Sequence, residues 1–193
     1  MTITMAAMAR NPNTRSRDMF ISMAVIVVPV LLLVWFFSSP GEEEPQRVDV
    51  AAQLKRATVE SPYPLLVAEG LGSEWVPVRA AWALEGQPWI TGEPAEANAW
   101  QVGYLSPDGI YFGIQQRDGA EAAFVRSATR EGHAVGGEVE AAGRSWERYE
   151  SSDGRTRSLV SEGEADTAVV AADADFVALE AFAATLTEAA PQA

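Results

Sequence analysis

Three residues that could contact a ligand alternate along one short stretch of this chain. Arg144, Trp146 and Arg148 occupy every second position of the sequence RSWERY, so a β-strand would place all three side chains on one face. Guanidinium groups beside an indole ring can bind an anion or a glycan. The same alternation is typical of ordinary neighbours on paired strands, and the sequence leaves both interpretations open.

A fourth candidate is Trp89, which lies in the sequence GQPWITG. The proline and glycines around it favour a loop, where an indole ring can be exposed and can serve as a contact anchor. Packing of the ring within its own loop is the alternative. We therefore take Trp89, together with the three alternating residues, as the candidate contacts for a ligand or partner.

Recognisable catalytic and cofactor-binding motifs are absent from the sequence. The chain has one histidine, His133, which its glycine-rich surroundings place in a loop, and one imidazole cannot form a histidine-rich zinc site. Asp-Gly pairs at Asp108, Asp118 and Asp153 lack the spacing of a calcium loop and indicate turns. Neither a phosphate-binding loop nor a G-x-S-x-G nucleophile motif occurs. We predict no catalytic, cofactor-binding or metal-binding residues.

Residues 19–37 form an uncharged, almost wholly apolar run of 19 residues. As a helix, this run would be roughly 28 Å long, which is close to the thickness of the hydrocarbon core of a bilayer. A cleaved signal peptide is shorter and ends in an A-x-A-like site, so we predict a transmembrane helix that is retained. Arg10, Arg15 and Arg17 precede it and three glutamates at 42–44 follow it. This asymmetry predicts a single-pass protein of the cell membrane with a cytoplasmic N-terminus and an extracytoplasmic C-terminal domain.

The predicted organisation has four parts: a cytoplasmic tail (1–18), the transmembrane helix (19–37), an acidic, proline-containing linker (38–47) and an extracytoplasmic domain (48–193). After the apolar run there remain 11 Lys and Arg against 26 Asp and Glu, a net charge of about −15. Such a surface repels nucleic acid, so we predict no nucleic-acid partner. The absence of cysteine excludes disulfides.

Alternating apolar residues indicate that the extracytoplasmic domain contains strands. The clearest hairpin is WQVGYLSPDGIYFGIQQ, in which SPDG (106–109) is a turn signal. EWVPVRAAWAL predicts a strand whose Val76, Val78, Ala80, Trp82 and Leu84 share one face, with Pro77 favouring an edge position. We predict three or four further strands over 137–172. Helices are predicted at 48–57, with Asp49 as N-cap, at 118–130, and at 173–186, where Asp173 or Asp175 is the cap and Phe176, Leu179, Phe182 and Leu186 share a face.

This order of elements predicts the α+β class, with a mainly antiparallel sheet and helices packed on one or both of its faces. Trp82 and Trp100 lie on alternating strand faces and are predicted to lie in the core.

Four stretches resemble an uncharacterised family: EGLGSEWVPVRA, WQVGYLSPDGIYFGIQQ, GRSWERYESSDGRTRSLV and ADFVALEAFAATL. The family is that of actinobacterial single-pass membrane proteins known as domain of unknown function four-two-four-five. The resemblance covers the anchor and nearly the whole outer domain, and it implies no assigned activity. The arrangement of elements is also similar to the PsbP/Mog1-like α/β/α sandwich of some envelope lipoproteins, which is a similarity of fold alone.

The sequence thus favours a membrane-anchored protein with a non-enzymatic binding or scaffold role in the cell envelope, acting on an envelope protein or a small ligand. An alternative is a small cell-wall hydrolase or carbohydrate-active enzyme, which would need two carboxylates that face each other about 5–10 Å apart. A purely structural role within a membrane complex is the third possibility.

Overall fold

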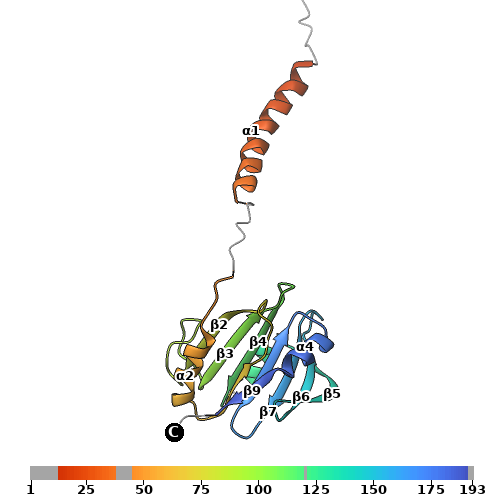
Figure 1. The fold of residues 1–193 in the computed structure, drawn as a ribbon. Helices are drawn as coiled ribbons and strands as arrows, with labels where there is room; N and C mark the ends of the chain where they lie inside the picture. The colour runs from red at the N-terminus through yellow and green to blue at the C-terminus, as the bar shows by residue number, and fades with distance from the viewer. Residues whose placement is uncertain (1–12, 38–44, 120, 191–193) are drawn as a thin grey trace, which may run out of the picture. The chain divides into compact units, whose positions relative to one another are not determined.

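The computed structural model describes residues 13–37, 45–119 and 121–190, and within the first segment it describes side chains from Met19 to Trp35. The chain divides into two units, residues 1–44 and 45–193. Among the described residues, the first unit holds one helix and the second, called the body here, holds the strands (Figure 1). The start of the predicted tail, residues 38–44 of the predicted linker and Ala120 lie outside the described residues.

Helix α1 (Asn13–Phe37) covers the apolar run and contains Pro29. Its side chains from Met19 to Trp35 are all exposed, and most of them are large and apolar. The hydroxyl of Ser22 donates a hydrogen bond to the Met19 carbonyl oxygen (3.0 Å), so this hydroxyl has a partner within the helix. Within the described residues, no helix is both long enough and apolar enough to cross a membrane.

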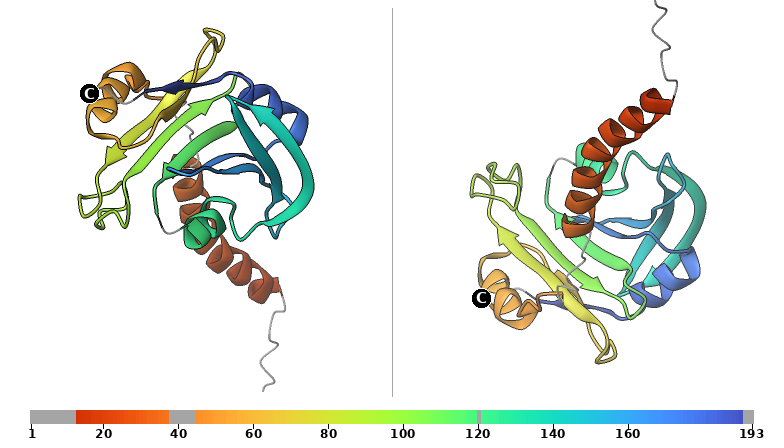
Figure 2. Two further views of the ribbon diagram at one scale, coloured as in Figure 1. Left: turned by 90° about the horizontal axis from the view of Figure 1, so that it is seen from below. Right: turned by 90° about the horizontal axis from the view of Figure 1, so that it is seen from above.

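The body is built on two antiparallel sheets, which confirms the predicted α+β class with a large antiparallel sheet. The larger sheet has seven strands in the order β2-β3-β4-β8-β7-β6-β5, and β1 pairs with β9 in a second, two-stranded sheet. Figure 2 shows that the larger sheet is strongly curved. The strands are β1 (Leu65–Ala68), β2 (Val76–Ala83), β3 (Ala99–Leu105), β4 (Tyr111–Arg117), β5 (His133–Ala141), β6 (Arg144–Glu150), β7 (Arg157–Glu162), β8 (Thr167–Ala172) and β9 (Leu186–Ala189).

The predicted hairpin is confirmed as β3 and β4, whose alternating apolar residues meet across the pair. Val102 lies opposite Ile114 and Tyr104 lies opposite Phe112. The turn closes when the Gly109 N–H donates to the Ser106 carbonyl oxygen (2.9 Å). Gly109 has a φ of 75° there, a conformation that glycine adopts without strain.

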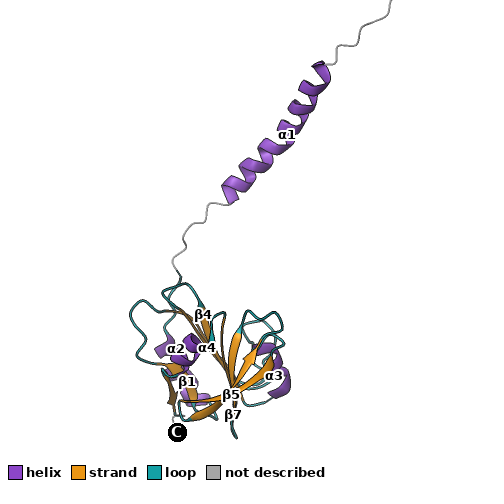
Figure 3. Cartoon of the chain, turned by 90° about the vertical axis from the view of Figure 1, so that its right-hand side faces the viewer, coloured by secondary structure: helices purple, strands orange, loops and turns teal. Residues whose placement is uncertain are grey.

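Three short helices cover the two faces of the larger sheet. They are α2 (Val50–Glu60), α3 (Glu121–Ala128) and α4 (Phe176–Ala183). The carboxylate of Asp49 caps α2 and that of Asp175 caps α4, as expected for N-cap residues. The helices α2 and α4 lie on one face with β1 and β9, and α3 lies on the other (Figure 3).

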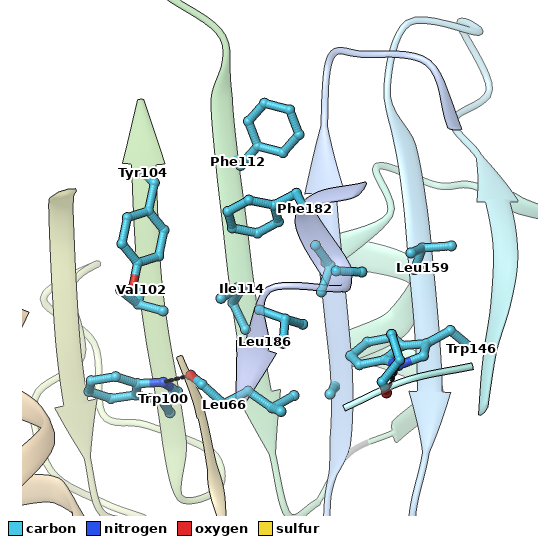
Figure 4. Packing of buried hydrophobic residues seen from close by; sticks show 14 of the residues in the cluster. Leu66, Trp100, Val102, Tyr104, Phe112, Ile114, Trp146, Leu159, Phe182 and Leu186 are labelled. Carbon is cyan, nitrogen blue, oxygen red and sulfur yellow. Dashed lines mark hydrogen bonds between the residues drawn. The ribbon is translucent and has the colours of Figure 1, made fainter. Parts of the chain in front are cut away.

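The main core fills the space between the larger sheet and the layer formed by α4, β1 and β9. Figure 4 shows the buried rings of Trp100, Phe112 and Phe182 between aliphatic side chains of both layers. Trp100 is 1% exposed, which confirms that it belongs to the core, and Trp82 is half-buried and packs against this cluster. A smaller cluster on the opposite face packs α3 against β7 and β8.

Strand β2 differs from its prediction because it contains a bulge beside its proline. The register of β2 shifts between Pro77 and Arg79, so Val76 pairs with Leu105 whereas Ala80 pairs with Val102. Val76 and Ala80 therefore lie on opposite faces of the sheet. The prediction that Val76 shares the face of Ala80 is therefore wrong.

The glycine-rich stretch after α3 is also a strand rather than a loop. His133 begins β5, and the register between β5 and β6 shifts between Ala134 and Glu138. Gly136 and Gly137 lie at this shift with φ values of 80° and 89°, which side chains disfavour. The glycines that favoured a loop thus form a bulge within an edge strand.

The C-terminal helix ends earlier than its apolar spacing predicts. Helix α4 stops at Ala183, and Leu186 begins strand β9 opposite Ala68 of β1. Leu186 still reaches the core, with 4% of its surface exposed. Helical spacing and strand alternation both bury Leu186, so the sequence pattern did not distinguish them.

A buried polar connection joins the two sheets. The side chain of Gln116, on β4, is completely buried. Its Oε1 accepts from the Leu66 N–H (2.6 Å), and its Nε2 donates to the Pro64 carbonyl oxygen (3.0 Å) and to Asp166 Oδ2 (2.8 Å). One amide therefore satisfies two main-chain groups beside β1 and a buried carboxylate next to β8.

Replacing Gln116 by alanine should destabilise the body strongly. The substitution leaves the Leu66 N–H and part of Asp166 buried without a partner, which costs about 2–4 kcal/mol in the free energy of unfolding. Urea denaturation followed by circular dichroism measures this loss.

The adjacent Gln115 provides the matched control because its side chain points to the opposite face of β4 and bonds to none of these groups. Gln115→Ala should change the free energy of unfolding by no more than about 0.5 kcal/mol. Equal effects of the two substitutions would contradict the role assigned to Gln116.

Candidate ligand-binding face

The predicted RSWERY residues lie on β6, on the face that packs against the core. Trp146 has 0% of its surface exposed, and its indole N–H donates to the Ala141 carbonyl oxygen (2.9 Å). The three residues share one face, as the alternation predicted. The described structure leaves no surface of Trp146 open to a ligand.

Arg144 is held by two carboxylates from distant parts of the chain. Its guanidinium donates two hydrogen bonds to Asp166 (2.9 and 3.0 Å) and one to Glu188 (2.8 Å). The side chains of Arg144 and Asp166 are only 12% and 3% exposed. Burial alone would lower the pKa of Arg144, but its bonds to the two carboxylates and their charges raise it above its ordinary value. Arg144 therefore extends the buried connection from Gln116 and Asp166 to β9.

Arg148 makes a similar connection to α4. Its Nε donates to Glu180 Oε1 (2.7 Å), and its guanidinium lies 5.4 Å from the centre of the Phe176 ring. Both arginines are thus engaged by carboxylates of their own chain. Of the four predicted contact residues, Trp89 lines one of the hollows described below.

Trp89 lies in the loop between β2 and β3, which folds back on itself as a small hairpin. The main-chain N–H of Trp89 donates to the Glu93 carbonyl oxygen (2.8 Å), and Pro88 forms an isolated antiparallel β-bridge with Pro94. The indole is half-buried and lines a hollow of about 570 Å³. Gln101, Gln115, Arg117 and Phe124 also line this hollow.

A second hollow, of about 380 Å³, continues along the same face of the sheet. Tyr111 and Gly113 of β4 line it, with Arg130 and Asp173 at its far side, and it shares Gln115 with the first hollow. We call the two together the β4 furrow. The loop that carries Trp89 forms one end of the furrow, and α3, which packs against β4, β7 and β8, stands beside it.

The furrow offers polar side chains but no facing pair of free carboxylates in the residues that line it. Glu93 and Glu96 come from one loop, and Asp173 accepts from the Thr156 hydroxyl (2.5 Å) and pairs with Arg130 (3.2 Å). Within the described residues, no group of three or more His, Cys, Asp or Glu could hold a metal ion. Rings, amides and guanidinium groups of this kind can bind a ligand through stacking and hydrogen bonds.

A third hollow, of about 420 Å³, opens on the other side of the sheet. Its walls are mostly apolar, and Trp75 there stacks on Phe182 with ring centres 5.6 Å apart. The ring of Phe112 completes this aromatic group, 5.2 Å from Trp75. These rings mainly pack against one another, and the hollow has fewer polar groups than the furrow.

Sequence reasoning missed Tyr111 and Gln115 as candidate contacts. Both occupy the alternate positions of the β4 strand, between the apolar residues that enter the core. The sequence did contain a signal. These outward-facing positions hold polar or small residues, whereas solvent-facing positions of a strand often hold charged ones. The sequence does not show where α3 packs, so only the tertiary structure shows that α3 leaves Tyr111 and Gln115 uncovered.

Replacing Arg144 by methionine should cost about 3–5 kcal/mol in the free energy of unfolding, because Asp166 then remains buried without its cation. Arg148→Met removes a partly exposed pair and should cost about 1 kcal/mol. Chemical denaturation of both variants measures the difference. A loss no larger for Arg144→Met than for Arg148→Met would contradict the structural role of Arg144.

Comparison with known proteins matches residues 12–186 to one family, described as Protein of unknown function (DUF4245). No curated protein matches the chain. No solved structure matches it either, so the similarity to the PsbP/Mog1-like sandwich stays a prediction. The match spans most of the 193 residues and includes both sheets apart from the end of β9. This chain belongs to the DUF4245 family.

Proposed function

We propose that this protein is a membrane-anchored binding module of the cell envelope, in which α1 holds the body at the membrane and the β4 furrow binds a ligand. The observation that carries the proposal is the exposed apolar surface of α1. Apolar side chains cover it from Met19 to Trp35 with no charged residue between them. An exposed apolar surface of this extent needs a lipid or protein environment.

A bilayer is the environment that suits α1 best. Its apolar residues are distributed all round the helix, whereas a helix that packs on a protein keeps a polar face. Pro29 would break a helix in water, but helices in membranes tolerate proline. The arginines before the apolar run and the glutamates after it favour a cytoplasmic N-terminus and an external body.

A binding role is favoured over hydrolysis because of the groups that line the furrow. Its carboxylates either come from one loop or are engaged by Thr156 and Arg130. A glycoside hydrolase needs two carboxylates on opposite sides of the bond that it cleaves. The proposed ligand is an envelope protein or a small envelope component, and the furrow provides the contacts.

The anchor is tested with the full-length chain carrying a C-terminal tag. We expect it to remain in the membrane pellet after washing with alkaline carbonate, because an apolar helix in the bilayer resists extraction. A variant that lacks residues 19–37 should move to the supernatant. A variant in which leucines replace these residues should stay in the pellet, since only hydrophobicity and length matter.

The orientation is tested by adding a protease to intact cells whose wall has been removed. Cleavage of the tagged body from outside supports the proposed topology. The proposal fails if carbonate extracts the full-length chain or if the body is protected until the membrane is broken.

A further inference from the structure

We propose that the β4 furrow binds a saccharide chain that carries acetamido groups. This inference rests on the binding role proposed above and names the class of ligand. It comes from three features of the furrow: a tyrosine ring that lies flat on the sheet, an amide with no partner among the described residues, and an indole at the opposite end.

The ring of Tyr111 lies across the backbone of two glycines. A Cβ atom built on Gly103 would lie 2.1 Å from the Tyr111 hydroxyl, and one built on Gly113 would lie 2.9 Å from a ring carbon. Gly103 and Gly113 face each other on β3 and β4, so together they leave room for the flat ring. Tyr111 is 38% exposed and presents its outer face as a platform for the C–H groups of a sugar ring.

Polar groups beside this platform hold the ring and remain available to a ligand. The side chains of Gln101 and Arg79 lie close enough to the Tyr111 hydroxyl for both to act on it. Arg79 is exposed, and no carboxylate in the described part of the chain lies within ion-pair distance of it. On a body with so large an excess of acids, a guanidinium without a carboxylate can bind hydroxyl or carbonyl oxygens of a ligand.

Gln115 lies between the two hollows and makes no side-chain hydrogen bond to any residue that the structure describes. Its amide offers two donors and one acceptor. An acetamido group carries the complementary N–H and carbonyl oxygen, so the two amides can form a pair of hydrogen bonds. Plain hydroxyl groups would satisfy the Gln115 amide less completely.

Trp89 adds a second ring at the other end of the furrow. Rings at both ends, with amides between them, suit a ligand made of at least two sugar units. The hollow beside Trp89 alone has about 570 Å³, within the usual range of small-ligand sites.

An extended peptide suits this site less well. Peptides that add to sheets bind through the free main-chain groups of an edge strand, but β3 and β4 are paired on both sides within the sheet. The furrow also lacks a row of apolar pockets for alternate side chains. Its flat rings and planar amides match sugar rings better.

Binding is tested by titration calorimetry on the full-length chain in lipid nanodiscs, where no glycoside detergent competes. The probes are a tetramer of β-1,4-linked N-acetylglucosamine, cellotetraose, and an acetylated tetra-alanine peptide that has amides but no sugar rings. We expect the amino-sugar tetramer to bind at least fivefold more tightly than either of the others.

Tyr111→Ala should weaken binding of the amino-sugar tetramer by about tenfold through loss of the platform. Tyr111→Phe keeps the ring and should stay within about threefold of the unmodified chain. Gln115→Ala should weaken binding by about fivefold with its unfolding free energy unchanged, which separates recognition from folding. Val177→Ala, at an exposed position of α4 on the other side of the sheet, is the remote control and should bind normally.

The inference is overturned if the amino-sugar tetramer does not bind, if the peptide binds more tightly, or if Gln115→Ala and Tyr111→Ala both bind like the unmodified chain. Such a result would leave the anchor intact in carbonate extraction, so failure of the ligand class and failure of the membrane role are distinguishable.

Discussion

The body depends on a buried row of polar groups that joins its two sheets. Gln116 contacts main-chain groups beside β1 and the carboxylate of Asp166, and Arg144 links that carboxylate to Glu188 on β9. Each charge in this row is neutralised by a partner, and a buried charge is tolerated only on that condition. Apolar packing could slide one sheet over the other, but these directional bonds fix the position of the small sheet on the large one.

The same constraint assigns different tasks to the two faces of β4. Successive side chains of a strand point to opposite faces, so Gln116 is committed to the sheet connection while its neighbour Gln115 faces the furrow. Two chemically identical side chains thus have different roles: Gln116 holds the fold together, and Gln115 faces solvent. Arg144 and Arg148 follow the inward pattern on β6, where carboxylates of the body satisfy them. The groups that remain free for a ligand lie beside α3, on the part of this face that α3 does not cover.

Local features of the sequence predicted much of the fold. The β3–β4 hairpin was identified because its alternation and its turn lie within 17 contiguous residues, and the caps Asp49 and Asp175 act on the residue three positions later. The bulges and β9 were missed because they depend on strand pairing. At the candidate site, Trp89 was identified from its loop, whereas the partners of Arg144 lie 22 and 44 residues away and leave no local pattern.

The sequence by itself determined the family, the α+β class, the acidic charge of the chain and the apolar run at 19–37, because these follow from composition and from periodicity within short segments. Only the tertiary structure decided which aromatic and charged residues are committed to the interior. Trp146 and Trp89 are both indoles that could contact a ligand, yet one is fully buried and the other lines a hollow. Burial depends on which distant segments pack over a residue, and alternation along a strand does not specify which face those segments cover.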